Sequence, residues 1–232
     1  MENMNQKLKA NKQTQSHYGY DHPREYNVGF IPHKSGKYRI EIDTQIDDVS
    51  QFSTAIQVLD VAREDDEVEI HLQSNGGDVN ACGAFLHSMH KCQAPIHIIA
   101  SGGCHSAATH ILLLGDSFEL ADNFNSLIHN GASGAFGNIN EYHAKSDFDK
   151  QFLMNYYWDI YEGFLSREEF EDMMEGKNIW VDAAGWCERA VARMKYFQEK
   201  VDNMQKEAQK ASRKPRIKKA KVVDTSEKLV VE

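Results

Sequence analysis

One serine of this sequence stands where a nucleophile for acyl transfer is expected. Ser106 follows a glycine pair, Gly102–Gly103, and precedes a mostly apolar run over 107–114. An apolar lead-in over 96–100, two glycines and a second apolar run are typical of a buried strand, a tight turn and a buried helix. Free backbone N–H groups and the helix dipole at such a helix start favour the oxyanion that forms when a serine attacks a carbonyl. A serine that only caps the helix is the alternative.

A second glycine pair could complete such a site. Gly76–Gly77 lies between a predicted strand and a predicted helix, as Gly102–Gly103 does. Parallel strands bring turns of this kind to the same carboxyl edge of a sheet, where sites tend to form. The backbone N–H of Ala107, together with that of Gly77 or Asp78, would then face an oxyanion.

Three histidines compete for the role of general base. His129 ends a predicted strand and opens a glycine-rich loop at the same sheet edge, which favours it. His110 lies one helical turn after Ser106 and leans back toward it, but its apolar surroundings favour a packing role. His105 is adjacent to the serine and cannot easily face it. The sequence therefore predicts a Ser106–His129 pair.

The hydrophobic pattern predicts an α/β fold to position these turns. Strands are predicted over 37–46, 67–72, 95–100, 117–121 and 126–129, with a short extended segment over 177–181. Helices are predicted over 52–62, 81–92, 107–114, 139–164 and 183–210, and a capping box at 165–169 begins another.

Composition and charge narrow the class of protein. The chain has 232 residues and a net charge of −9, which argues against bulk nucleic-acid binding by its body. Its four cysteines form no CxxC pair, which is typical of reduced thiols in the cytoplasm. The polar N-terminus has no secretory signal, and no apolar run approaches the roughly 20 residues of a membrane span. We therefore expect a soluble, cytoplasmic protein without membrane contact.

No cofactor and no metal are expected. The chain lacks the phosphate-binding pattern GxxxxGK[ST], so any use of ATP would belong to a partner. His87 and His90 share a predicted helix face, but such a pair without further spaced ligands is more often a surface feature than a metal site.

The stretch around both glycine pairs resembles a known family. From Ser74 to Gly115 the sequence SNGGDVNACGAFLHSMHKCQAPIHIIASGGCHSAATHILLLG is similar, without a gap, to the proteolytic subunit of the Clp protease, ClpP. The family's Ser-Pro-Gly-Gly turn corresponds to 74–77, and its Gly-x-Ala-Ala-Ser turn to 102–106. The stretch NFNSLIHNG, 123–131, resembles the family segment that ends in the catalytic histidine, which falls on His129.

This resemblance covers about residues 37–190 and implies a fold and an activity. The fold would be the ClpP/crotonase-type spiral of ββα units with a long handle helix. The activity would be that of a serine endopeptidase that hydrolyses peptide bonds through an acyl-enzyme, with Ser106 as nucleophile and His129 as general base. Gly77 and Ala107 would supply the oxyanion N–H groups. The family also implies homo-oligomeric rings, protein or peptide substrates and an AAA+ unfoldase as a candidate partner.

Several positions beside the nucleophile depart from the family pattern. Asn75 replaces the family's proline, and Cys104 and His105 replace two alanines. Ser101, at the end of the lead-in strand, resembles the nucleophile of signal-peptide peptidase A, but no lysine is obviously placed to activate it.

The third member of the triad stays open. The family's acid position falls near Asn178. An asparagine can hold the tautomer of the histidine but cannot stabilise the imidazolium by charge. Asp172 and Asp182 are the alternatives.

We predict three parts in the chain. The parts are a partly disordered N-terminal arm over 1–35, a ClpP-like peptidase domain over 36–192, and a helical extension with a basic, flexible tail over 193–232. The tail could contact nucleic acid, although a solubilising end is favoured.

The divergent pattern, the arm and the tail resemble the phage-encoded relatives that process capsid proteins in the host cytoplasm or the procapsid. The rivals are a catalytically inactive ClpP-like structural subunit, which Asn178 favours, and a crotonase-like enzyme acting on acyl thioesters.

Overall fold

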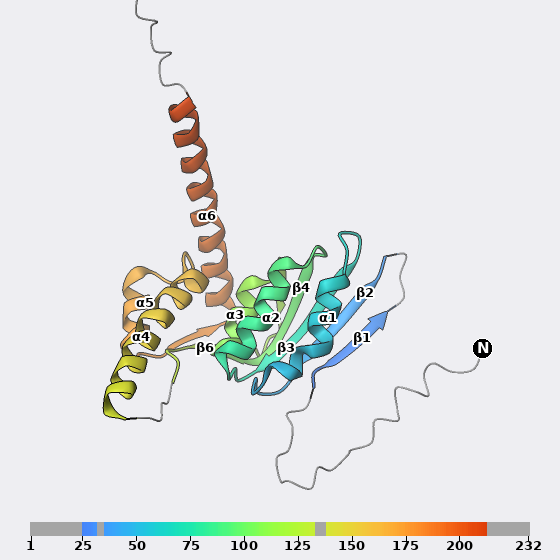
Figure 1. The fold of residues 1–232 in the computed structure, drawn as a ribbon. Coiled ribbons are helices and arrows are strands. Elements are labelled where there is room, and N and C mark those ends of the chain that lie inside the picture. The colour runs from blue at the N-terminus through green and yellow to red at the C-terminus, as the bar shows by residue number, and fades with distance from the viewer. Residues whose placement is uncertain (1–24, 32–34, 133–137, 213–232) are drawn as a thin grey trace, which may run out of the picture.

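The computed structural model describes residues 25–31, 35–132 and 138–212, with side chains up to residue 210 (Figure 1). Seven strands in these residues form one mixed sheet, in the order β1–β2–β3–β4–β6–β7 with β5 beside β4. The strands are β1 (Asn27–Ile31), β2 (Lys37–Ile42), β3 (Glu67–Ser74), β4 (Ile96–His105), β5 (Ser117–Leu120), β6 (Asn125–Ile128) and β7 (Ile179–Asp182). The helices are η2 (Val49–Phe52), α1 (Ser53–Val61), α2 (Val79–Lys91), α3 (Ala107–Leu114), α4 (Ile139–Tyr161), α5 (Arg167–Met174) and α6 (Ala183–Ser212). The predicted α/β class is confirmed.

The core of the sheet is parallel, as the alternation of strands and helices predicts. β2, β3 and β4 pair in parallel, and alternate side chains of each point into the core, among them Ile40, Ile70 and Ile98. Helices α1 and α2 lie side by side over this apolar face (Figure 1). The opposite face is polar, and Glu69 there accepts hydrogen bonds from Lys37 Nζ at 2.9 Å and His71 Nε2 at 2.6 Å. Because β2, β3 and β4 run in parallel, their carboxyl ends lie at one edge of the sheet.

Strand β4 does not end at the glycine pair, so the predicted tight turn at Gly102–Gly103 is wrong. Leu72 pairs with Ala100 and Ser74 pairs with Cys104, which means that β4 bulges outward between its two halves. The first half pairs with β5 and the second with β6. The bulge thus lets β4 change partners and continue to His105.

Helices α4 and α5 form a separate layer against the far end of the sheet (Figure 1). Tyr157 and Tyr161 of α4 are buried, and the Tyr161 hydroxyl lies 2.6 Å from the Thr109 hydroxyl of α3. The predicted capping box is present, because Ser166 Oγ accepts from the backbone N–H of Glu169 at 3.1 Å. Trp186 of α6 is fully buried and closes this end of the core.

The two ends of the chain fall largely outside the described residues. Most of the predicted N-terminal arm lies there, but Asn27–Ile31 forms β1, antiparallel to β2, which the sequence did not predict. The basic tail also lies there beyond residue 212, whereas α6 confirms the helix predicted from 183 to 210. Within the described ranges, no helix combines the length and the apolar character needed to cross a membrane.

Candidate active site

Ser106 sits in a strained turn between β4 and α3. Its φ of 53° and ψ of −128° lie outside the ordinary regions for a residue with a side chain, which costs about 1–3 kcal/mol. The turn is held from both sides, because the Ser106 N–H donates to the Leu127 carbonyl at 2.7 Å and the Ser106 carbonyl accepts from Thr109 Oγ1 at 2.6 Å. The serine side chain makes no capping hydrogen bond, so the simple helix-cap interpretation is wrong.

The Gly76–Gly77 turn lies directly against this serine. A Cβ on Gly76 would come within 2.8 Å of Ser106 Cβ, so only glycine lets the two turns approach this closely. Gly77 forms a parallel bridge with Ile46, in which the Gly76 carbonyl accepts from Ile46 N–H at 2.9 Å and Asp78 N–H donates to the Ile46 carbonyl at 2.7 Å. The Gly77 N–H therefore points away from Ile46. At the first position of α3, the Ala107 N–H has no partner within the helix.

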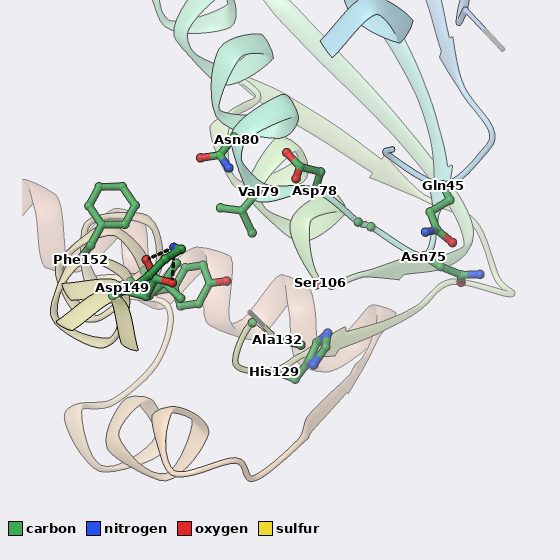
Figure 2. A pocket seen from close by; sticks show the side chains of 16 residues that line it. Gln45, Asn75, Asp78, Val79, Asn80, Ser106, His129, Ala132, Asp149 and Phe152 are labelled. Carbon is green, nitrogen blue, oxygen red and sulfur yellow. Dashed lines mark hydrogen bonds and ion pairs between the residues drawn. The ribbon is translucent and has the colours of Figure 1, made fainter. Parts of the chain in front are cut away.

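A cleft of about 600 Å³ brings these groups together (Figure 2). It is lined by residues from the ends of β3 and β6, the first turns of α2 and one side of α4: Gln45, Asn75, Gly76, Gly77, Asp78, Val79, Asn80, Ser106, His129, Gly131, Ala132, Lys145, Asp149, Phe152, Leu153 and Tyr157. His129 is the one histidine among these described lining residues and lies beside the Ser106 turn in Figure 2. The predicted serine and histidine thus share one cleft.

His129 has the electrostatic surroundings of a general base. It follows β6 directly, and the next residue, Asn130, anchors the loop by donating from Nδ2 to the Met174 carbonyl at 2.9 Å. Partial burial lowers the pKa of His129, and the nearby charge of His105 lowers it further. The imidazole is therefore neutral at pH 7, the form that can accept a proton. No hydrogen bond joins it to Ser106 among the described residues, and such bonds often tighten only when substrate binds.

The rival residues lie outside the cleft. His105 Nε2 lies 2.9 Å from Asn125 Oδ1, and its ring packs edge-on against Trp180 at 5.6 Å. His110 is buried beneath the site, where burial lowers its pKa to about 3. This confirms the packing role predicted for His110. Ser101, on the bulge of β4, is not among the residues that line the cleft.

The third member of a triad is best judged from the pairing of β6 with β7. These strands are antiparallel, with Leu127 opposite Trp180 and Ile128 opposite Ile179. One further step in this register brings Asn178 level with His129. The Asn178 side chain is exposed, and within the described residues it makes no hydrogen bond to His129.

Both alternative acids have other partners. Asp172 Oδ1 accepts from Lys177 Nζ at 2.6 Å. Asp182 Oδ1 accepts from the backbone N–H of Gly185 at 2.8 Å, at the start of α6. Neither aspartate lines the cleft that contains His129.

One wall of the cleft was not predicted as part of the site. It belongs to α4, where Lys145 and Asp149 form an ion pair at 2.7 Å and Phe152, Leu153 and Tyr157 add an apolar surface. The aromatic stripe of this helix is visible in the sequence, but its spacing is equally typical of packing. Only the return of α4 over the sheet edge shows that one side faces Ser106.

Comparison with known protein families agrees with this geometry. The family model described as Clp protease matches residues 35–151, about half of the chain. The chain belongs to the Clp protease family. Members of this family are peptidases that generally assemble into rings and act on proteins. Among curated proteins, no sequence matches the chain. The family match contains Ser106, His129 and both glycine pairs, whereas Asn178 lies beyond its end.

Proposed function

We propose that this Clp family chain is an active serine endopeptidase with Ser106 as nucleophile and His129 as general base. The observation that carries the proposal is the shared cleft, in which a strained serine, a neutral histidine and the Gly76–Gly77 turn converge from three separate strand ends. A serine that only packed or capped a helix would not need the positive φ that turns its hydroxyl into the cleft.

The reaction follows from the positions of these groups. Ser106 Oγ attacks the carbonyl carbon of the peptide, and His129 takes the hydroxyl proton. The negative charge on the carbonyl oxygen is stabilised by the N–H groups of Gly77 and Ala107. His129 then gives the proton to the leaving amine, the C–N bond breaks, and the acyl group stays on Ser106. Water, activated by His129, releases the acid and restores the serine.

We assign Asn178 to the third position of this triad. The β6–β7 register supports it, because that register brings Asn178 level with His129 while Asp172 and Asp182 bind other partners. An asparagine oxygen can accept the second N–H of the imidazole and fix its tautomer. Without a negative charge, the imidazolium gains less stabilisation, so we expect slower turnover than with aspartate.

Labelling with a fluorophosphonate probe tests the nucleophile. The wild-type protein is expected to label at Ser106, and Ser106→Ala abolishes labelling because the phosphonate bond cannot form. His129→Ala is expected to slow labelling by at least about 10²-fold, since the hydroxyl loses its base. Intact-protein mass spectrometry measures the adduct, and peptide mapping locates it.

Ser101→Ala is the matched control, because Ser101 lies on β4 shortly before Ser106 but outside the cleft. It should label at the wild-type rate. A folded wild-type protein that never labels would contradict the proposal and favour the inactive structural subunit. Thioester hydrolysis that survives Ser106→Ala would instead favour the crotonase-like alternative.

The narrower proposal is that the substrates are phage capsid proteins. It rests on the departures at Asn75, Cys104 and His105 and on the basic tail, which lies outside the described residues. Such an enzyme would cut scaffold or capsid proteins in the host cytoplasm or in the procapsid. Co-expression with capsid and scaffold proteins tests this, because the narrower proposal predicts cleavage that Ser106→Ala abolishes.

A further inference from the structure

The second half of α6 stands clear of the body of the molecule (Figure 1). Its first half is tied to the corner between α4 and α5. The tie consists of hydrogen bonds from one face of the helix, at Arg189, Arg193, Tyr196 and Lys200. Beyond this corner, every side chain over 201–210 is exposed. A helix that projects in this way gains no stability from burial unless something covers it.

A second stripe on α6 is apolar and has the spacing of a coiled coil. Its members recur at alternating intervals of four and three residues: Ala190, Met194, Phe197, Val201, Met204 and Ala208. This alternation keeps one seam along the helix, which is the surface that two supercoiled helices bury. Met194 is 72%, Val201 45% and Met204 64% exposed. We call this stripe the α6 seam, and it lies beside the face that docks on the body.

We propose that the α6 seam pairs in antiparallel orientation with the same seam of a second copy of this chain. With the two-fold axis between Val201 and Met204, each Val201 faces the second copy's Met204. Phe197 then faces the second copy's Ala208, so the largest side chain meets the smallest. A parallel pair would stack phenylalanine on phenylalanine and alanine on alanine, which leaves a crowded layer and an empty one.

Charges beside the seam favour the same orientation. The antiparallel register sets Lys200 next to the second copy's Glu207, and the two-fold axis repeats this pair. A parallel register would set Lys200 next to the second copy's Gln205 instead. Lys200 Nζ already lies 2.9 Å from Glu162, so Glu207 would extend an existing ion pair. The antiparallel arrangement also puts the two bodies at opposite ends of the paired helices.

Sedimentation of the full-length chain over a range of concentrations tests the seam. Met204→Asp places a charge in the seam, and Asn203→Asp makes a matched change on its exposed neighbour. We expect the wild type and Asn203→Asp to double their subunit number reversibly as concentration rises. Met204→Asp should weaken this step at least about 100-fold, because two charges would be buried. Circular dichroism should show the same helix content in all three.

Two results would overturn the proposal. One is a subunit number that does not double in the wild type, as expected if the seam is covered by another protein or by residues 213–232. The other is an unchanged doubling step in Met204→Asp. The variant Ser106→Ala should assemble as the wild type does, so the outcome is independent of the proposed peptidase function.

Orientation has its own test. Glu207→Lys sets like charges against Lys200 in the antiparallel pair, and we expect it to weaken the doubling step about tenfold at low salt. The effect should shrink in high salt, because exposed charges are screened. An unchanged doubling step in Glu207→Lys would exclude the antiparallel register, since in a parallel pair Glu207 does not face Lys200.

Discussion

At the scale of single residues, the proposed oxyanion site depends on a glycine that nothing else can replace. Gly77 has a φ of 146°, and a Cβ there would lie 1.9 Å from the Ile46 carbonyl oxygen. Gly77→Ala must therefore break the Ile46 bridge and move the N–H that we propose as an oxyanion donor. We expect peptidase activity and probe labelling to fall by at least about 10²-fold, the usual cost of one oxyanion donor.

The control for this change is Gly83→Ala in α2, where the nearest atom to a new Cβ is Tyr156 Oη at 3.5 Å. This is an ordinary contact, and alanine in a helix is stabilising by about 0.5–1 kcal/mol. Gly83→Ala should keep full activity. Equal activity in Gly77→Ala would show that its N–H does not hold the oxyanion.

The pKa of His129 sets the acid limb of the proposed reaction. The base must be neutral, and burial together with the charge of His105 lowers its pKa below the usual 6.5. Activity should therefore rise with pH through a midpoint below 6.5. His105→Gln removes one cause, so we expect the midpoint to move upward, toward 6.5. The measurement is kcat/KM for a peptide substrate against pH, and an unmoved midpoint would mean that His105 does not act on His129.

At the scale of elements, the packing of α3 on α4 is built around a histidine that cannot ionise. His110 is buried against the rings of Tyr156, Tyr157 and Tyr161, at centroid distances of 6.0, 5.4 and 5.5 Å, and its Nδ1 has no partner among the described residues. Its pKa is about 3 in the folded protein, against about 6.5 when unfolded. Below pH 6.5 the unfolded chain binds the proton and the folded chain does not.

Stability is therefore lost as pH falls from 6.5 toward 3, by up to about 1.4 kcal/mol per pH unit. His110→Phe keeps a ring and removes the titration. We compare the free energy of unfolding of His110→Phe with that of the wild type. The difference, in favour of the variant, should be about 2 kcal/mol larger at pH 5 than at pH 8. Urea denaturation at both values measures this difference. His90 is exposed, so His90→Phe is the control, and it should leave the dependence of stability on pH unchanged.

The elements also show how far the sequence could predict this molecule. Local patterns sufficed for the parallel strands and for the capping box at Ser166, because each depends on residues close in sequence. The Ser106–His129 pair was instead expected from the shared edge of parallel strands and from the resemblance to ClpP. The course of β4 through Gly102–Gly103 did not follow from local pattern, since β3 and β6 supply the hydrogen bonds that keep it extended. β1 was missed because four of its five residues are exposed and only its pairing with β2 defines it.

At the scale of the whole molecule, α4 joins the candidate active site to the outer surface. Phe148 and Ile139 are each 67% exposed, and the rings of Phe148, Phe152 and Tyr156 stack in a row with centroids 6.0 and 5.9 Å apart. Phe152 also lines the cleft. A helix with an exposed aromatic row is expected to be covered in an assembly, and the resemblance to ClpP implies that this helix would lie in the contact between rings.

Assembly through α4 would therefore also shape the cleft. Phe148→Asp should lower the mass of the assembly in light scattering and, because Phe152 loses its stacked neighbour, slow probe labelling of Ser106 in the same sample. Ser146→Asp also adds one negative charge at an exposed position of α4, so it is the control for charge and helix propensity. If labelling stayed fast while the mass fell, the cleft would be complete in the single subunit and the ring would serve only to enclose it. If neither changed, the exposed row would not be an assembly surface, and the α6 seam would be the remaining route to self-association.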